Sequence, residues 1–230
     1  MRLKGVLSYP FRHPSALLLL IQLLGILLYP WMDNLALGRT LFGVFGLLVL
    51  GATLRTVRNS RQQTWIAVVL ALLVLALSSL NWLTPHWRLE LLIALLEASF
   101  YLYAAGVLIA YMSADWRATT DEIFASAATF TLLAWGFAFL YNACQVVIPN
   151  SFGAAVHPEL PRSWMELLYL SFITLSGVGI GDIIPLSPMA RALVMLEAFA
   201  GVMYIALVVS RLIGLTLLGR RDGPERGRNV

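Results

Sequence analysis

The sequence predicts an all-α membrane protein with six transmembrane helices and one short re-entrant helix. Hydrophobic residues make up 60% of the chain and charged residues only 12%, against about 25% charge in a typical soluble domain. The apolar residues gather in six long stretches. Before the last of them, a break and a short apolar segment interrupt the pattern. This composition excludes a soluble globular domain, because too few polar residues remain to cover its surface.

The six apolar stretches are each near or above the ~20 residues that a helix needs to cross the hydrocarbon core. They run over 15–32, 35–54, 65–84, 89–112, 123–145 and 189–218. Basic residues precede the first stretch, but no small-residue cleavage site follows it, so we expect a retained helix and not a cleaved signal. The short connections between the first five stretches predict that these helices pack as antiparallel neighbours.

The basic residues of the connections predict the orientation of the chain. With the N-terminus inside, twelve of the 16 basic residues are cytoplasmic, and the others are Arg39, Arg88, Arg162 and Arg191. We therefore expect both termini in the cytoplasm. The protein is expected in the plasma membrane, as a multi-pass protein of a bacterial inner membrane. The basic excess then reflects membrane topology, and no nucleic-acid partner is expected.

A break separates the fifth stretch from the short apolar segment. Turn-forming residues crowd it: Pro149, Asn150, Gly153, Pro158 and Pro161. No membrane helix continues through them. The segment at 164–175 is too short to span and is predicted to be a re-entrant half-helix. Ser163 and Glu166 form a capping-box pattern that would start it at Trp164. Its end, near Thr174, carries the negative half of the helix dipole, which favours a nearby cation.

Glycine then recurs at alternate positions, in Gly177, Gly179 and Gly181, before Asp182. Glycine adopts backbone angles closed to other residues, so the alternation can turn successive carbonyl groups the same way. Non-helical backbone at this depth must be buried in protein or satisfied by water and ions. A column of carbonyl oxygens that replaces the hydration shell of a cation meets both demands.

At these residues the chain resembles the pore domain of tetrameric potassium channels, whose filter reads Thr-Val-Gly-Tyr-Gly-Asp. The resemblance covers about 120–218, with an outer helix, a turret at 149–162, a pore helix and an inner helix. It implies a selectivity filter made of Ser176, Gly177, Val178, Gly179, Ile180, Gly181 and Asp182. Ser163, Glu166 and Thr174 become residues of the pore helix. A glycine-rich loop of a transporter is the alternative.

The resemblance also implies an assembly and a ligand. Potassium or another monovalent cation would bind the carbonyl oxygens of Gly177, Val178, Gly179 and Ile180. One filter strand supplies a quarter of each carbonyl ring, so we expect a homotetrameric pore. Membrane lipid is the other expected partner, and no cofactor is expected beyond permeant potassium or sodium ions and bound lipid.

The filter departs from the family pattern at two positions. Gly177 stands in place of threonine and loses its hydroxyl, while Ser176 lies one residue too early to replace it. Ile180 stands in place of an aromatic residue. Tyr169 and Leu170 occupy positions that often hold two tryptophans, so we expect the outer filter to have an apolar brace instead of a hydrogen-bonded one. Cation conduction follows from this pattern more firmly than strong selectivity for potassium over sodium.

The layout predicts three parts: a four-helix peripheral, sensor-like domain at 1–114, a pore domain at 115–219 and a basic tail at 220–230. A voltage sensor needs basic residues within the field, but the stretch 89–112 has none. Arg55, Arg58 and Arg61 have the spacing of a sensor but lie between the second and third stretches. We expect them to be a cytoplasmic cluster, with a displaced sensor or a lipid anchor as alternatives. Opening should depend little on voltage.

Four intramembrane residues are candidates for gating: Arg39, Glu97, Glu197 and Gly201. An ionisable group at such depth suggests a functional site. Arg39 is expected to pair with Glu97 or Glu90, and proton sensing is the alternative. Glu197 is expected to lie behind the filter or against the outer helix, most simply as a buried hydrogen-bonded carboxyl. Gly201 is either a bending point or a packing residue.

The leading hypothesis is therefore a tetrameric cation channel that conducts potassium. A non-selective channel of the same fold, permeable to sodium or calcium, is the first alternative. A secondary transporter would have inverted repeats and two broken helices, whereas the sequence has one broken segment. An enzyme is not expected, because the intramembrane polar groups are too sparse to nominate a catalytic cluster. The single cysteine, Cys144, excludes an internal disulfide and a cysteine-based zinc site.

Overall fold

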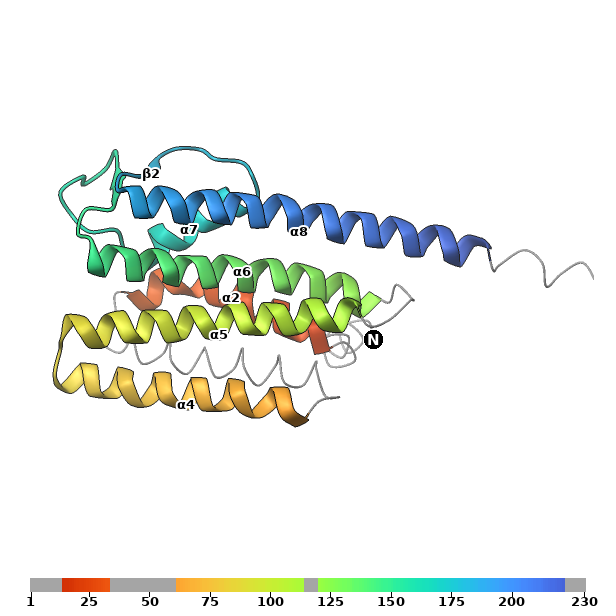
Figure 1. Ribbon diagram of the computed structural model, residues 1–230, viewed down its shortest axis with the longest axis horizontal. Coiled ribbons are helices and arrows are strands. Elements are labelled where there is room, and N and C mark those ends of the chain that lie inside the picture. The colour runs from red at the N-terminus through yellow and green to blue at the C-terminus, as the bar shows by residue number, and fades with distance from the viewer. Residues whose placement is uncertain (1–13, 34–60, 114–119, 222–230) are drawn as a thin grey trace, which may run out of the picture.

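The computed structural model describes residues 14–33, 61–113 and 120–221, which are mostly helical (Figure 1). The helices are α2 (Pro14–Asp33), α4 (Arg61–Leu83), α5 (Trp87–Ser113), α6 (Thr120–Val147), α7 (Trp164–Leu175) and α8 (Pro188–Arg221). Two short strands are β1 (Phe152–Ala154) and β2 (Ile183–Pro185). Five of the six predicted stretches coincide with helices, and the stretch at 35–54 lies outside the described residues.

Three of the described helices are long and apolar enough to cross a membrane, over Trp87–Ser113 in α5, Asp121–Val147 in α6 and Pro188–Arg211 in α8. The apolar parts of α2 and α4 are shorter, at Pro14–Leu28 and Val68–Asn81. The chain is therefore a membrane protein, and the count of six spans stays a prediction.

Helix α6 is the centre of the described structure and packs against α2, α5, α7 and α8. Figure 1 shows α4, α5 and α6 side by side, and these three helices alternate in direction, as the sequence predicts for neighbours with short connections. The contact between α5 and α6 uses small buried residues, among them Ala104, Ala105 and Ala128. A Cβ atom on Gly136 would lie 2.7 Å from Cδ2 of Leu102. Small residues let helices approach closely where lipid offers no hydrophobic driving force.

The two strands tie the end of α6 to the start of α8. They pair antiparallel, with Phe152 opposite Pro185 and Ala154 opposite Ile183. Helix α8 then begins at Pro188, and the backbone N–H of Ala190 donates to the Ser187 hydroxyl at 3.1 Å. Serine before the first turn and proline within it are a common helix start. Strands of three residues are too short to show alternation, which is why the sequence did not predict them.

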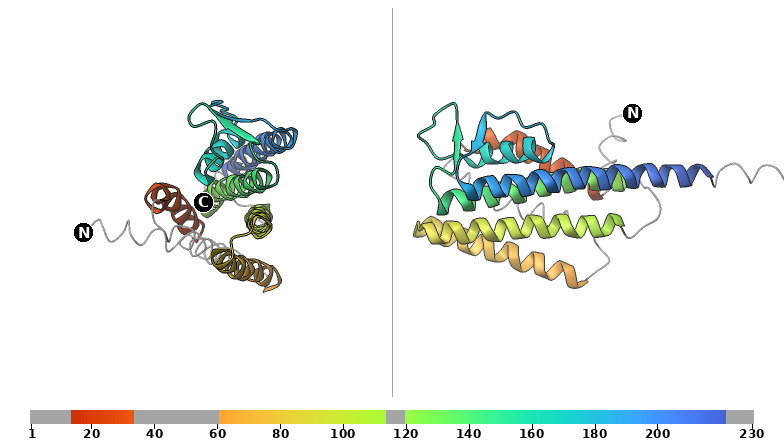
Figure 2. Two further views of the ribbon diagram at one scale, coloured as in Figure 1. Left: turned by 90° about the vertical axis from the view of Figure 1, so that its left-hand side faces the viewer. Right: turned by 45° about the horizontal axis from the view of Figure 1, so that its top comes forward.

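Helix α7 lies beside the first part of α8 and against α6 (Figure 2). Its side chains join two buried clusters. Leu168 belongs to the larger cluster with residues of α2, α5 and α6. Leu167, Leu170 and Ile173 belong to the smaller cluster, which includes Tyr141 of α6. The packing therefore fixes α7 on both sides, and with it the glycine segment that follows.

Candidate functional site

Helix α7 begins and ends where the sequence predicts. The backbone N–H of Ser163 donates to Glu166 Oε2 at 2.7 Å, and the N–H of Glu166 donates to the Ser163 hydroxyl at 3.3 Å. This capping box starts the helix at Trp164, and the last helical residue is Leu175. Its 12 residues span about 18 Å, well short of the ~30 Å hydrocarbon core. A helix of this length cannot cross the core, so a re-entrant course for α7 stays a prediction.

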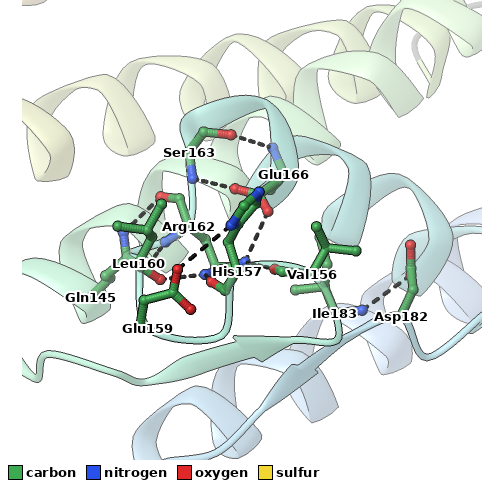
Figure 3. Close-up of polar contacts among 10 residues, drawn as sticks. All are labelled: Gln145, Val156, His157, Glu159, Leu160, Arg162, Ser163, Glu166, Asp182 and Ile183. Carbon is green, nitrogen blue, oxygen red and sulfur yellow. Dashed lines mark hydrogen bonds and ion pairs between the residues drawn. The ribbon is translucent and has the colours of Figure 1, made fainter.

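Arg162 holds the turret onto the start of α7 (Figure 3). Its guanidinium donates to the carbonyl oxygens of Val156 at 3.2 Å, His157 and Leu160. It also pairs with Glu166 Oε1 at 3.0 Å, and the residue is only 4% exposed. From the count of basic residues, Arg162 is expected to be one of the four that do not lie on the cytoplasmic side of the membrane. The four-residue spacing of Arg162 and Glu166 is the sequence signal for this structural role.

Replacement of Arg162 by methionine is expected to destabilise the protein by about 2–4 kcal/mol, because three carbonyl oxygens lose the donor that a buried guanidinium supplies. Thermal unfolding of the detergent-purified protein measures the loss. Glu159→Gln is the matched control, because the Glu159 and His157 side chains are 65% and 72% exposed and an exposed pair contributes little. Equal stability of both variants would contradict this role of Arg162.

The three glycines after α7 have left-handed backbone. Their φ angles are +76° at Gly177, +57° at Gly179 and +83° at Gly181, whereas Val178 and Ile180 have ordinary φ. The N–H of Gly177 donates to the Thr174 carbonyl, and the N–H of Gly179 to the Ile173 carbonyl, both at 3.0 Å. The segment thus turns back from the end of α7 with alternating handedness, which is the alternation that the glycine spacing predicts.

Gly177 has a backbone conformation that threonine, the family residue at this position, rarely adopts. A β-branched residue such as threonine is a genuine outlier at its φ of +76°. Ser176 closes α7, with its N–H donating to the Phe172 carbonyl at 3.1 Å. The sequence predicted only a lost hydroxyl at Gly177. The inner end of the segment also has a conformation that threonine would strain.

The brace of the outer segment is partly polar. The Tyr169 hydroxyl of α7 hydrogen-bonds to the carboxylate of Asp182, which also accepts from the Ile183 N–H at 3.1 Å. Leu170, in contrast, is 3% exposed among apolar side chains. The expectation of an apolar brace is therefore wrong at Tyr169, because a phenol from α7 reaches the acid that follows the last glycine.

Glu197 is fully buried where α6, α7 and α8 meet. The Tyr141 hydroxyl of α6 donates to its Oε2 atom. The Ser171 hydroxyl of α7 lies within hydrogen-bond distance of its Oε1 atom. Glu197 of α8 thus contacts both α7 and α6. The sequence reasoning did not find Tyr141 or Ser171, whose only signal is a hydroxyl within an apolar stretch.

Gly201 packs against the end of α7. A Cβ atom at this position would lie 2.1 Å from the carbonyl oxygen of Leu175. Helix α8 runs through Gly201 without interruption, from Pro188 to Arg221. Of the two expectations for this glycine, the structure places it at a close packing contact.

The peripheral candidates are less completely described. Glu97 is half-buried on α5 and Glu90 is exposed. Their expected partner Arg39 lies outside the described residues, so the pair stays a prediction. Arg55 and Arg58 also lie outside the described residues, and Arg61 is the first residue of α4.

Polar contacts at the other end of α8 tether it to α6. The Tyr204 hydroxyl donates to the Ser126 carbonyl. Arg211 pairs with Glu122 at 3.4 Å, and the Glu122 side chain is 5% exposed. Helices α6 and α8 are therefore joined by side-chain contacts at several points, from Tyr141 and Glu197 to Glu122 and Arg211, which the sequence reasoning did not foresee.

Comparison with known proteins identifies this region. A family model described as an ion channel matches residues 127–216, which hold α7, the glycine segment and most of α6 and α8. Over 74 residues the chain is 35% identical to the inward rectifier potassium channel Kirbac3.1 of Paramagnetospirillum magnetotacticum. That match covers 32% of this chain and 22% of the relative. No solved structure matches the chain. The similarity of residues 127–216 to an ion-channel family model, together with the shorter match to a potassium channel, supports a potassium-channel family for this region.

Proposed function

We propose that this protein is a homotetrameric channel that conducts potassium across the plasma membrane through residues 176–182. The observation that carries the proposal is the left-handed backbone at Gly177, Gly179 and Gly181, directly after a half-helix, within an ion-channel domain. Alternating handedness turns successive carbonyl groups to one side of a strand. Carbonyl oxygens so arranged replace the hydration shell of a cation.

The cation sites of this proposal are the carbonyl oxygens of Gly177, Val178, Gly179 and Ile180. The C-terminal end of α7 directly precedes the same region, and the negative end of its dipole favours positive charge there. The potassium channel among the relatives supports potassium as the permeant ion. Ser176 and Asp182 bound the filter, and Ser163, Glu166 and Thr174 hold its pore helix.

Four copies complete the filter. In the single chain, Val178 is 66% and Ile180 62% exposed, and the polar backbone beside them has no place in lipid. Exposed apolar residues also line the first half of α8, among them Leu196 at 61% and Phe199 at 67%. Neighbouring copies would cover both surfaces. The pore domain at 115–219 then surrounds a fourfold axis, and the helices at 1–114 form the periphery.

A less selective cation channel is the second candidate, and Gly177 favours it. Without a threonine hydroxyl, an ion at the innermost site keeps more of its water, so coordination number discriminates less sharply. Ile180 acts in the same direction because its side chain forms no hydrogen bond. The bond between Tyr169 and Asp182 opposes this by bracing the outer filter.

Recordings from the purified protein in planar bilayers test the function. Under a potassium–sodium gradient, we expect a reversal potential on the potassium side of zero but short of the potassium equilibrium value. Ile180→Tyr should move it closer to that value, and the voltage dependence of conductance should be shallow because 89–112 lacks basic residues. Absence of cation current, or a conducting unit that native mass measurement finds to be a monomer or dimer, would overturn the proposal.

A further inference from the structure

Glu197 belongs to a chain of polar groups that joins three helices behind the filter. Thr174 of α7 hydrogen-bonds to the Tyr141 hydroxyl of α6. Tyr141 contacts Glu197 Oε2, and Glu197 Oε1 contacts the Ser171 hydroxyl. The Ser171 hydroxyl also lies 2.7 Å from the carbonyl oxygen of Ala134, which is the last of these polar groups. We propose that Glu197 carries a proton in the folded channel and, as a neutral acid, positions the end of α7 that holds the filter.

The number of protons available to this chain of polar groups indicates that Glu197 is a neutral acid. Each hydroxyl has one proton to donate, and the Ala134 carbonyl has none. Four contacts join Thr174, Tyr141, Glu197, Ser171 and Ala134, whereas the three hydroxyl groups supply three protons. If Ser171 donates to the Ala134 carbonyl, Glu197 must donate to Ser171. A proton on Oε1 of Glu197 satisfies all four contacts, and an ionised carboxylate leaves one of them without a hydrogen.

No cation faces Glu197 among the described residues. Helices α6 and α7 contain no lysine or arginine, and neither does β2. On α8 itself, Arg191 donates to the Pro185 carbonyl at 3.3 Å and Arg211 pairs with Glu122. An unpaired carboxylate with no exposed surface would lose its hydration without an opposite charge in return, which is strongly unfavourable.

The other titratable groups on the elements around Glu197 do not alter this balance. Tyr141 contributes a hydroxyl already counted, and Cys144 lies buried one turn further along α6. The remaining groups have partners away from Glu197: Asp121 with Ser15, Glu122 with Arg211, Glu166 with Arg162, Tyr169 with Asp182 and Tyr204 with the Ser126 carbonyl.

One end of this chain of polar groups is Thr174, which lies in the last turn of α7, just before the proposed filter. Thr174 and Ser171 lie one turn apart on α7, on the side that α6 and α8 cover. The carbonyl oxygen of Thr174 accepts the N–H of Gly177 at 3.0 Å. A shift of Thr174 would therefore move the first glycine of the filter. Glu197 contacts the Tyr141 and Ser171 hydroxyl groups, and we class it as a positioning residue that acts through these two and Thr174.

Infrared spectroscopy of the full-length protein in lipid tests the proton. With carbon-13-labelled glutamate, the wild-type protein at neutral pH should show the carbonyl stretch of a protonated glutamic acid that is absent from E197Q. The same band should persist in E97Q, which removes a glutamate of α5. Identical spectra of wild type and E197Q in this region would overturn the proposal, because Glu197 would then be ionised.

Ion flux per assembled channel tests the positioning role, and this part rests on the proposed function. Glutamine keeps one donor and one acceptor, so E197Q should remain within about twofold of wild type. E197A should lose about tenfold, because it leaves buried hydroxyl groups unpaired. S171A removes one hydroxyl from the chain of polar groups, so its ion flux should lie between those of E197Q and E197A. It supplies the test if E197A does not assemble.

Three outcomes of the flux series would overturn the positioning role: wild-type flux in E197A, wild-type flux in S171A when E197A does not assemble, or failure of E197Q to fold. Failure of E197Q counts because glutamine reproduces the shape and hydrogen bonds of the neutral acid. If even the wild-type protein conducts no ions, the proposed function fails, and the infrared band still decides the proton.

Discussion

Gly201→Ala is expected to abolish conduction and to weaken the assembled protein. A Cβ atom at this position would lie 2.1 Å from the oxygen, 2.8 Å from the carbon and 2.9 Å from the Cα of Leu175. All three are backbone atoms at the end of α7, so no side chain can rotate away. Helix α8 must move from α7, and overpacking of this kind costs about 1–3 kcal/mol or more in each subunit. Ion flux and the temperature of tetramer dissociation measure both effects.

Two other glycines give a graded control for this steric effect. A Cβ atom on Gly106 of α5 would have no atom within 4 Å, so alanine there should be neutral or slightly stabilising through its helix propensity. A Cβ atom on Gly136 would lie 2.7 Å and 2.8 Å from side-chain atoms of Leu102, which can give way in part, and at an ordinary 3.5 Å from its backbone nitrogen. The expected order of damage is Gly201, then Gly136, then Gly106. Wild-type flux and stability in Gly201→Ala would contradict the close contact between α8 and α7.

Local patterns in the sequence predict the centre of the candidate site well. The limits of α7 follow from Ser163 and Glu166, because a capping box involves residues three positions apart. The left-handed backbone at Gly177, Gly179 and Gly181 follows from glycine spacing, because few other residues adopt it. In both cases the chemistry that fixes the structure lies within a few residues of the chain.

Contacts between distant parts of the chain could not be predicted in this way. Tyr141 and Ser171 lie 56 and 26 residues from Glu197, and nothing in a single sequence pairs them. The count of basic residues places Arg162 at the outer side of the membrane but contains no information on its burial. For Gly201, the choice between bending and packing depends on which backbone passes the glycine, and only the fold brings Leu175 there.

Gly179→Ala is expected to remove conduction while leaving assembly largely intact. The φ angle of Gly179 is +57°, and no atom lies within 4 Å of a Cβ at this position, so the cost is conformational and not steric. Left-handed backbone costs about 1–2 kcal/mol for an ordinary residue, hence roughly 4–8 kcal/mol over four subunits. If alanine instead adopts ordinary φ, the carbonyl beside it turns away from the pore. Because Gly179 follows α7 and precedes α8, helix content and tetramer mass should stay at wild-type values, whereas flux should fall more than about a hundredfold.

Val178→Ala is the matched control, since Val178 already has ordinary φ and keeps its carbonyl in the filter. Comparable flux in the two variants would mean that conduction does not require left-handed backbone at Gly179.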